Sequence, residues 1–347
     1  MLKPEHRVAI LLHEGISGSN GKTGLTLLRY SQASIVAAID SQCANQSLRQ
    51  LTGIDTDVPI VASVTEALTY HPDVLAIGIA PSGGAIPEAW WLEIKQAIAS
   101  GLSVVNGLHT PMASDRELGE LLKEGQWIWD VRQEPPGLPV GTGKARSLPC
   151  RRVLTVGTDM AIGKMSTGLE LQKASLRRGL RSKFLATGQA GLMIVGDGVP
   201  LDAVRVDFAA GAIEQIVMRF GYDYDILYIE GQGSLLHPGS TATLPLIRGS
   251  QPTHLILVHR AGQTHIRNCP DVQIPPLSEV IKVYETVAAA GGAFAAVRVV
   301  ALALNTHHLD EAAARQAIEQ TRADTGIPCT DPVRFGAEAL LDAVMDL

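Results

Sequence analysis

The chain has 347 residues, of which 46% are apolar, and a formal net charge of -6. This length and apolar content exceed what one hydrophobic core usually organises, so two domains are expected. The acidic balance, without a basic cluster, excludes a protein that grips nucleic acid through its phosphates.

The cysteines show no Cys-x-x-Cys spacing, which argues against a disulfide framework or a structural zinc site. They are Cys43, Cys150, Cys269 and Cys329. The opening residues lack the apolar run of a signal peptide, and glycines and an arginine interrupt the weakly polar stretch 287–304. We therefore predict a cytoplasmic protein with no membrane partner and no bound metal.

In the first part of the chain, short β-branched runs alternate with longer helical patterns, which is typical of βαβ units and a parallel sheet. The predicted strands are Arg7–Leu12, Ile35–Ile39, Val74–Ile79 and Ser103–Asn106. The predicted helices are Lys22–Tyr30, Val64–Leu68, Pro87–Ala99 and Asp115–Glu124.

A proline- and glycine-rich stretch without periodicity lies between Arg132 and Arg152 and is typical of a domain boundary. A second α/β series follows it. Its predicted strands are Val153–Val156, Lys183–Ala186, Ile226–Ile229, His254–Val258 and Val297–Leu304. The sequence thus predicts two α/β domains, residues 1–146 and 147–347.

The strand that opens the second domain runs into a glycine loop, Gly157 to Lys164, and then into a helical run. This order lets backbone N–H groups and the positive end of a helix converge on phosphate oxygens, with Lys164 as a point charge. It predicts a P-loop NTPase-like, three-layer α/β/α domain. The predicted cofactor contacts are Gly157, Thr158, Asp159, Gly163, Lys164, Ser166 and Thr167.

The loop departs from the usual P-loop in two ways. Five residues rather than four separate Gly157 from Gly163, and Met165 stands where a Ser or Thr normally holds Mg²⁺. A thioether is a poor ligand for that hard cation. Either Ser166 or Thr167 takes over the metal, or the loop grips phosphates without metal-assisted hydrolysis.

The extended loop resembles that of dethiobiotin synthetase and its dimer-forming P-loop relatives. The likeness continues at Glu230-Gly231, which ends a predicted strand. The synthetase also ends a strand with Glu-Gly, near its metal and substrate. It also continues at Asn305, for which the resemblance implies a contact with a nucleotide base. A homo-oligomer, a dimer or higher, is expected from the same resemblance.

The first domain carries a glycine loop of its own, with Gly15, Gly18 and Gly21 after the first strand and Asp40 closing the next. This is a variant of the dinucleotide fingerprint, with Asp40 placed to meet a ribose. We predict these four residues as cofactor contacts. Segments 58–68, 78–84 and 97–106 are similar to the CoA-binding domain of succinyl-CoA synthetase, which implies a Rossmann-like first domain and makes CoA a candidate ligand of either domain.

Motifs spread over nearly the full length resemble the DgcN family. They are Asn106 to His109, Asp130 to Arg132, Gly163 to Thr167, Glu230 to Pro238, and Asp331 to Gly336. The resemblance implies N-acetylation of D-glutamate, or of a related amino acid, from acetyl-CoA.

This reaction needs a base that works near neutral pH, and His237 and His109 fit by their ordinary pKa, with Glu230 orienting the base. The N–H groups of residues 231–234 are predicted to meet the charge on the thioester oxygen. Guanidinium groups suit the carboxylates of the amino acid. The candidate arginines are Arg132, Arg260 and Arg267.

Two other functions stay open. A ligase or kinase like dethiobiotin synthetase would use ATP with Mg²⁺ and release ADP. A non-catalytic nucleotide-binding protein would bind ATP or CoA without turnover.

Overall fold

The computed structural model describes residues 2–18, 20–80 and 86–346. The chain divides into two compact units, one of residues 1–133 with 189–196, the other of residues 134–188 with 197–347. The predicted boundary at residues 146 and 147 lies inside the second unit. The reason is that the linker packs on a helix of that unit, where the Glu214 carboxylate accepts hydrogen bonds from the backbone N–H groups of Thr142 and Lys144.

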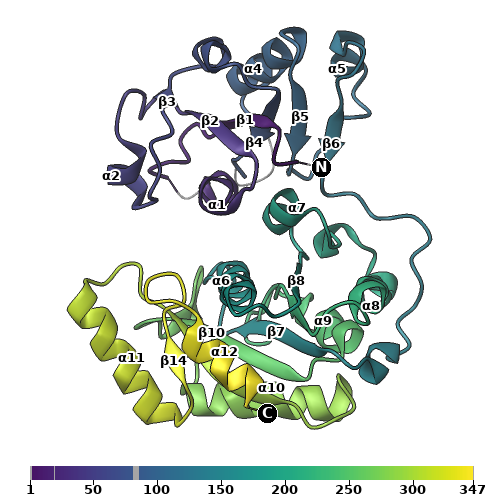
Figure 1. Ribbon diagram of the computed structural model, residues 1–347, viewed down its shortest axis with the longest axis vertical. Helices are drawn as coiled ribbons and strands as arrows, with labels where there is room; N and C mark the ends of the chain where they lie inside the picture. The colour runs from purple at the N-terminus through teal and green to yellow at the C-terminus, as the bar shows by residue number, and fades with distance from the viewer. Residues whose placement is uncertain (1, 19, 81–85, 347) are drawn as a thin grey trace. The chain divides into compact units, whose positions relative to one another are not determined.

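The first unit is a parallel sheet in the order β3-β2-β1-β4-β5-β6, the doubly wound arrangement of dinucleotide-binding folds. Its strands are β1 (Arg7–Leu11), β2 (Ser34–Ile39), β3 (Ile60–Val61), β4 (Val74–Ile77), β5 (Ser103–Asn106) and β6 (Ile128–Asp130). Its helices are α1 (Lys22–Tyr30), α2 (Leu48–Thr52), α3 (Val64–Ala67), α4 (Glu88–Ala99), α5 (Arg116–Leu121) and α7 (Gln189–Val195), with the 3-10 turn η1 (Leu68–Tyr70). Helices α3, α4 and α5 cover one face of the sheet, and α1 with α7 covers the other (Figure 1).

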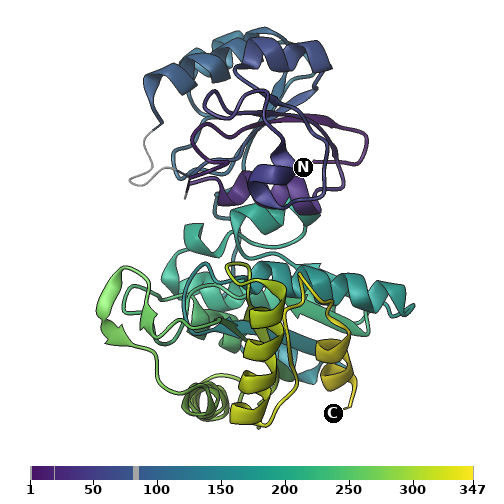
Figure 2. The same cartoon turned by 90° about the vertical axis from the view of Figure 1, so that its left-hand side faces the viewer.

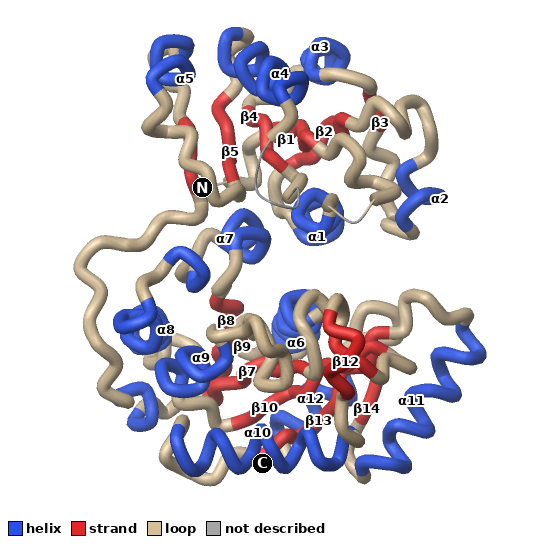
Figure 3. Tube along the Cα trace, turned by 180° about the vertical axis from the view of Figure 1, so that it is seen from behind, coloured by secondary structure: helices blue, strands red, loops and turns tan. Residues whose placement is uncertain are grey.

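The second unit is also a parallel sheet, in the order β14-β13-β10-β7-β9-β8. Its strands are β7 (Arg151–Gly157), β8 (Ser182–Leu185), β9 (Ile226–Ile229), β10 (His254–Arg260), β13 (Arg298–Asn305) and β14 (Cys329–Thr330). Its helices are α6 (Lys164–Arg177), α8 (Val206–Phe220), α9 (Thr243–Ser250), α10 (Leu277–Gly291), α11 (Glu311–Thr325) and α12 (Glu338–Met345), with the 3-10 turns η2 (Lys144–Ser147) and η3 (Leu201–Ala203). Helices α6 and α12 pack on each other, as do α8 and α9 (Figure 3).

A small antiparallel hairpin follows β10. Its strands are β11 (His265–Ile266) and β12 (Cys269–Gln273), and Figure 2 shows it at the edge of the second unit. The sequence did not predict this hairpin, nor β3, β6 and β14, because strands of two to five residues carry too little periodicity.

The predicted fold class is confirmed. Strands β4, β5, β9 and nearly all of β10 are buried on both faces, so apolar residues predominate in them. Helices on both sides of each sheet supply that burial. Within the described ranges, no helix is both long and apolar enough to cross a bilayer.

Gly211 on α8 tests how the linker is held. A Cβ at this position would overlap the carbonyl oxygen of Pro139, so Gly211→Ala should push the linker off the helix and lower the free energy of unfolding by about 1–3 kcal/mol. Gly291→Ala is the matched control, because a Cβ at the end of α10 meets no atom within 4 Å. Thermal melting of both variants measures the effect, and equal melting temperatures would refute the account.

Candidate active site

The P-loop joins β7 to α6 through two residues in left-handed conformations, Ala161 (φ 55°) and Gly163 (φ 116°). The N–H groups of residues 161 to 163 along this path have no acceptor among the residues the structure describes. Successive free amides at the start of a helix form an anion-binding hollow.

Lys164 begins α6 and is buried. Its ammonium donates a hydrogen bond to the carbonyl oxygen of Asp159 (2.6 Å), so it lies inside the loop. A Cβ on Gly157 would lie 3.2 Å from Lys164 Nζ, and one on Gly231 would lie 3.0 Å from Lys164 Cδ. Lys164 thus passes between the P-loop and the end of β9, where glycines leave room for it.

The three side chains that follow Lys164 differ in burial and in hydrogen bonding. Met165 is buried, and its thioether occupies the first turn of the helix. Thr167 donates its hydroxyl to the carbonyl oxygen of Gly163 (3.0 Å), while Ser166 is half-buried. The position after Lys164 therefore carries a thioether side chain, where metal-dependent phosphoryl transfer uses a hydroxyl oxygen.

Thr158 and Asp159 support the loop from within. Both are buried, and the hydroxyl of Thr158 shares a hydrogen bond with Nδ1 of His259 (2.9 Å). The Asp159 carboxylate accepts from Gln263 Nε2 (2.6 Å) and from the N–H of Arg267 (2.7 Å), which fixes the start of the β11–β12 hairpin to the P-loop. Both residues were predicted as cofactor contacts, and in this structure their side chains make hydrogen bonds to other residues of the protein.

Glu230 directly follows β9 and is buried. Its carboxylate accepts the N–H groups of Thr187 (2.8 Å) and Gly188 (3.1 Å). Because the side chain of Lys164 passes over the adjacent Gly231, Glu230 lies close to the P-loop.

The loop after Glu230 is tied to the P-loop by Tyr284, which sequence reasoning missed. Its buried hydroxyl donates to the carbonyl oxygen of Gly157 (2.7 Å) and accepts from the N–H of Leu235 (3.1 Å). Of the amides predicted to meet a thioester oxygen, Gly231 N–H donates to Thr155 Oγ1 and Ser234 N–H to Ser240 Oγ, so two of the four are engaged.

His237 lies in the same loop. The N–H of Gly239 donates to its Nδ1 (3.0 Å), so the neutral ring carries its proton on Nε2. In this conformation His237 presents a hydrogen-bond donor outward rather than a basic lone pair.

The carboxyl ends of β10 and β13 place two predicted residues side by side, Arg260 opposite Asn305. Asn305 donates to the carbonyl oxygen of Ile162 in the P-loop (2.9 Å) and accepts from Nδ1 of His307 (3.0 Å). Burial and the nearby Arg260 lower the pKa of His307 below its ordinary value. No motif signalled His307.

In the first unit, the glycine loop packs on itself. Cβ atoms at Gly18 and Gly21 would overlap the carbonyl oxygens of Glu14 and Gly15. Asp40 is fully buried, and its carboxylate accepts the N–H groups of Ile16 (3.3 Å) and Gln42 (3.1 Å). The predicted ribose acid therefore binds the loop itself in this structure. The last part of segment 78–84 lies outside the described residues.

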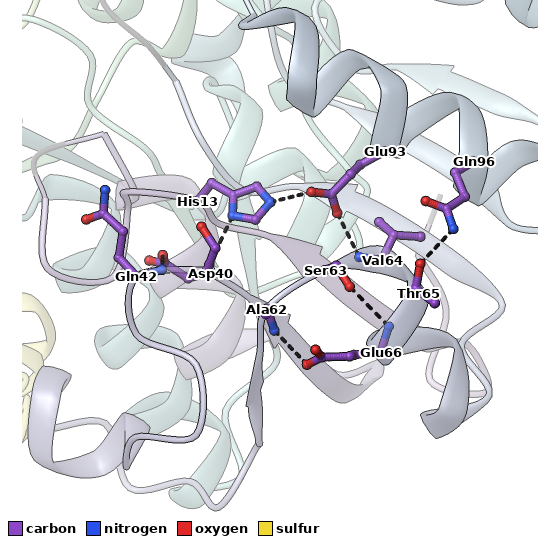
Figure 4. A network of polar contacts seen from close by, with 11 residues as sticks. His13, Asp40, Gln42, Ala62, Ser63, Val64, Thr65, Glu66, Glu93 and Gln96 are labelled. Carbon is purple, nitrogen blue, oxygen red and sulfur yellow. Dashed lines mark hydrogen bonds and ion pairs between the residues drawn. The ribbon is translucent and has the colours of Figure 1, made fainter.

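His13 lies two residues after the end of β1, and its contacts join three elements of the first unit (Figure 4). Its Nε2 contacts Glu93 Oε1 (2.9 Å), its Nδ1 accepts from the N–H of Ser41 (3.2 Å), and its ring stacks on Trp90. Burial raises the pKa of Glu93, but the bonds from His13 and the N–H of Val64 outweigh it and hold the pKa below its ordinary value. The network fixes the ends of β1, β2 and β3 to α4.

Two motifs of the first unit form one cluster. Asp130 accepts from the Asn106 side chain (2.7 Å). Next to it, Arg132 donates to the carbonyl oxygen of Gly107 (2.6 Å) and to Nε2 of His109 (3.1 Å). Because a guanidinium only donates, the His109 ring carries its proton on Nδ1. Burial, and then the charge of Arg132, lower the pKa of the exposed His109.

The predicted residues thus fall into two clusters. The second unit gathers the P-loop, Glu230, Arg260, Asn305 and Arg267, and the first unit gathers its glycine loop, Asp40, His109 and Arg132.

The sequence of both units matches one family. Residues 139–341 match the P-loop domain, and residues 41–134 the Rossmann-like domain, of DUF1611, a family described as a domain of unknown function. The chain belongs to the DUF1611 family.

Relatives in this family agree over most of the chain. A D-glutamate N-acetyltransferase of Tritonibacter scottomollicae is 38% identical over 284 residues, which cover 81% of this chain and 84% of that protein. A D-glutamate N-acetyltransferase of a Pseudoalteromonas species is 35% identical over 80% of this chain and 83% of its own length. The crystal structure of a DUF1611 protein from Anabaena variabilis is 69% identical and superposes with a TM-score of 0.96 over 99% of this chain and 100% of its own. These matches confirm the resemblance predicted from the motifs.

His259 makes the stability of the second unit depend on pH. Burial lowers its pKa to about 4, against an ordinary value of 6.5, so the unfolded chain binds a proton that the folded one excludes. Stability is therefore fully present above pH 6.5 and falls as the pH drops towards 4, by about 3 kcal/mol from this group. His259→Asn should flatten the decline in urea unfolding free energy over this range, and an unchanged slope would contradict the assignment.

Proposed function

We propose that this protein transfers an acetyl group from acetyl-CoA to the α-amine of D-glutamate or a related amino acid. Buried Met165 in the first turn of α6 carries the proposal, because the loop cradles phosphates yet offers a thioether where phosphoryl transfer needs a metal-binding hydroxyl. The names of two relatives, both D-glutamate N-acetyltransferases, support the same reaction.

The cofactor phosphates are proposed to lie on the free amides of residues 161–163 and on the Lys164 ammonium, which turns from Asp159 to the incoming anion. Glu230 is proposed as a positioning residue, since its carboxylate holds the backbone of Thr187 and Gly188 and it adjoins Gly231, over which Lys164 passes.

Arg132 is proposed to bind a carboxylate of the amino acid. When the guanidinium turns to that carboxylate, Nε2 of His109 loses its donor and becomes free to accept the proton of the substrate ammonium. In the overall reaction, the neutral amine nitrogen bonds to the thioester carbon, the carbon–sulfur bond breaks, and the departing thiolate of CoA takes up the second proton that the nitrogen loses. The products are the N-acetyl amino acid and CoA.

Lys164→Ala tests the cofactor site. Loss of a charge-assisted hydrogen bond costs about 1.5–3 kcal/mol, so the KM for acetyl-CoA should rise at least about tenfold. Lys173→Ala, on the exposed face of the same helix, is the control. Thiol release and phosphate release, each followed with D- and L-amino acids, measure the outcome. Mg²⁺-dependent phosphate release without thiol would instead indicate the ATP-dependent ligase or kinase, and ligand-induced stabilisation with neither product would indicate a non-catalytic binder.

His109→Asn tests the base. Since the ring must be neutral to accept a proton and its pKa is lowered, kcat/KM should fall only as the pH drops through a value below 6.5. The variant should lose about 10²-fold or more in kcat at neutral pH with the KM for acetyl-CoA unchanged. An identical pH profile in parent and variant would remove His109 from the reaction.

A further inference from the structure

Arg260 forms no ion pair with any carboxylate in the described part of the chain. Its side chain is half-buried at the end of β10, and its Nε is fully buried with no hydrogen-bond partner among the residues described. A buried donor left without an acceptor is costly, and native proteins rarely keep one without a ligand or water to satisfy it.

The surroundings of Arg260 favour an anion. Its positive charge acts on His307, whose ring stacks edge-on with His308 at 5.4 Å. The nearby carboxylate, Asp331, is occupied, because its oxygens accept the N–H and hydroxyl of Thr306 and the N–H groups of Val333 and Arg334. Asp331 thus lies near His307 with its hydrogen-bonding capacity taken.

Arg260 and His307 lie close to the P-loop. Arg260 pairs in register with Asn305, whose side chain holds the carbonyl oxygen of Ile162, and Gly157 pairs with Val258, two residues before Arg260. At about 3.3 Å per strand residue, Arg260 begins on the order of 7 Å beyond the level of Gly157, on the neighbouring strand. One bound molecule with two separated anionic groups can reach both places.

We propose that Arg260, with His307, binds the 3′-phosphate of CoA while the P-loop binds its diphosphate. The two groups of CoA are separated by a single ribose, whereas the thioester lies at the far end of the pantetheine arm. A cation this close to the P-loop therefore meets the nucleotide end of the cofactor, and not the carboxylate of the amino acid for which the sequence suggested it. The inference rests on the proposed use of acetyl-CoA.

Calorimetric titration of the full-length protein with CoA and with 3′-dephospho-CoA tests the assignment. The parent should bind CoA about tenfold or more tightly than dephospho-CoA, as expected for a charge-assisted contact. Arg260→Gln should weaken CoA to the level of dephospho-CoA and leave dephospho-CoA binding unchanged, which also shows that the variant is folded. Arg298→Gln, at the opposite end of the same strand pair, should match the parent.

Three results would overturn the assignment: a parent that does not distinguish the two ligands, an Arg260→Gln variant that weakens both equally, or one that raises only the KM for the amino acid. The last would place the substrate carboxylate at Arg260. A parent that binds neither form and releases no thiol from acetyl-CoA would instead refute the proposed function itself.

Discussion

The site of the second unit depends on one constraint, that the chain between β7 and α6 must turn its amides outward around the Lys164 ammonium. Left-handed Ala161 and Gly163 produce this path, and the carbonyl oxygen of Asp159 holds the ammonium in place. Backbone amides at the start of a helix bind anions in many proteins, and the proposed cofactor site rests on this property.

Polar contacts from four other elements keep the loop in that shape. Asp159 holds the hairpin, Thr158 contacts His259 on β10, Tyr284 of α10 holds Gly157, and Asn305 of β13 holds Ile162. Thr158, Asp159 and Ile162 of the loop are buried, as are His259 and Tyr284, so losing one of these bonds leaves an unsatisfied group in a buried place. The conformation of the loop is therefore fixed by residues from several elements at this edge of the sheet.

Several residues predicted to contact a ligand make hydrogen bonds within the protein. Asp40 and Asp159 sit where acids contact ligands in related folds, yet their carboxylates hold backbone amides and a glutamine side chain. The sequence does not show which ring nitrogen of His237 or of His109 carries the proton. Their hydrogen bonds decide this, and thus whether each ring nitrogen donates or accepts.

The sequence by itself determined the two α/β units, the P-loop with its thioether at Met165, and the resemblance of several motifs to a family. These features depend on residues that are close together in the chain: the period of apolar residues, the spacing of glycines and the types of adjacent residues. Only the tertiary structure decided that residues 189–196 belong to the first unit, that Tyr284 and His259 support the loop, and that Arg260 and His307 meet beside Asn305. These residues are far apart in the chain and carry no motif. They come together because parallel strands bring their carboxyl ends to one edge, and which strands are neighbours is set by packing over the whole sheet.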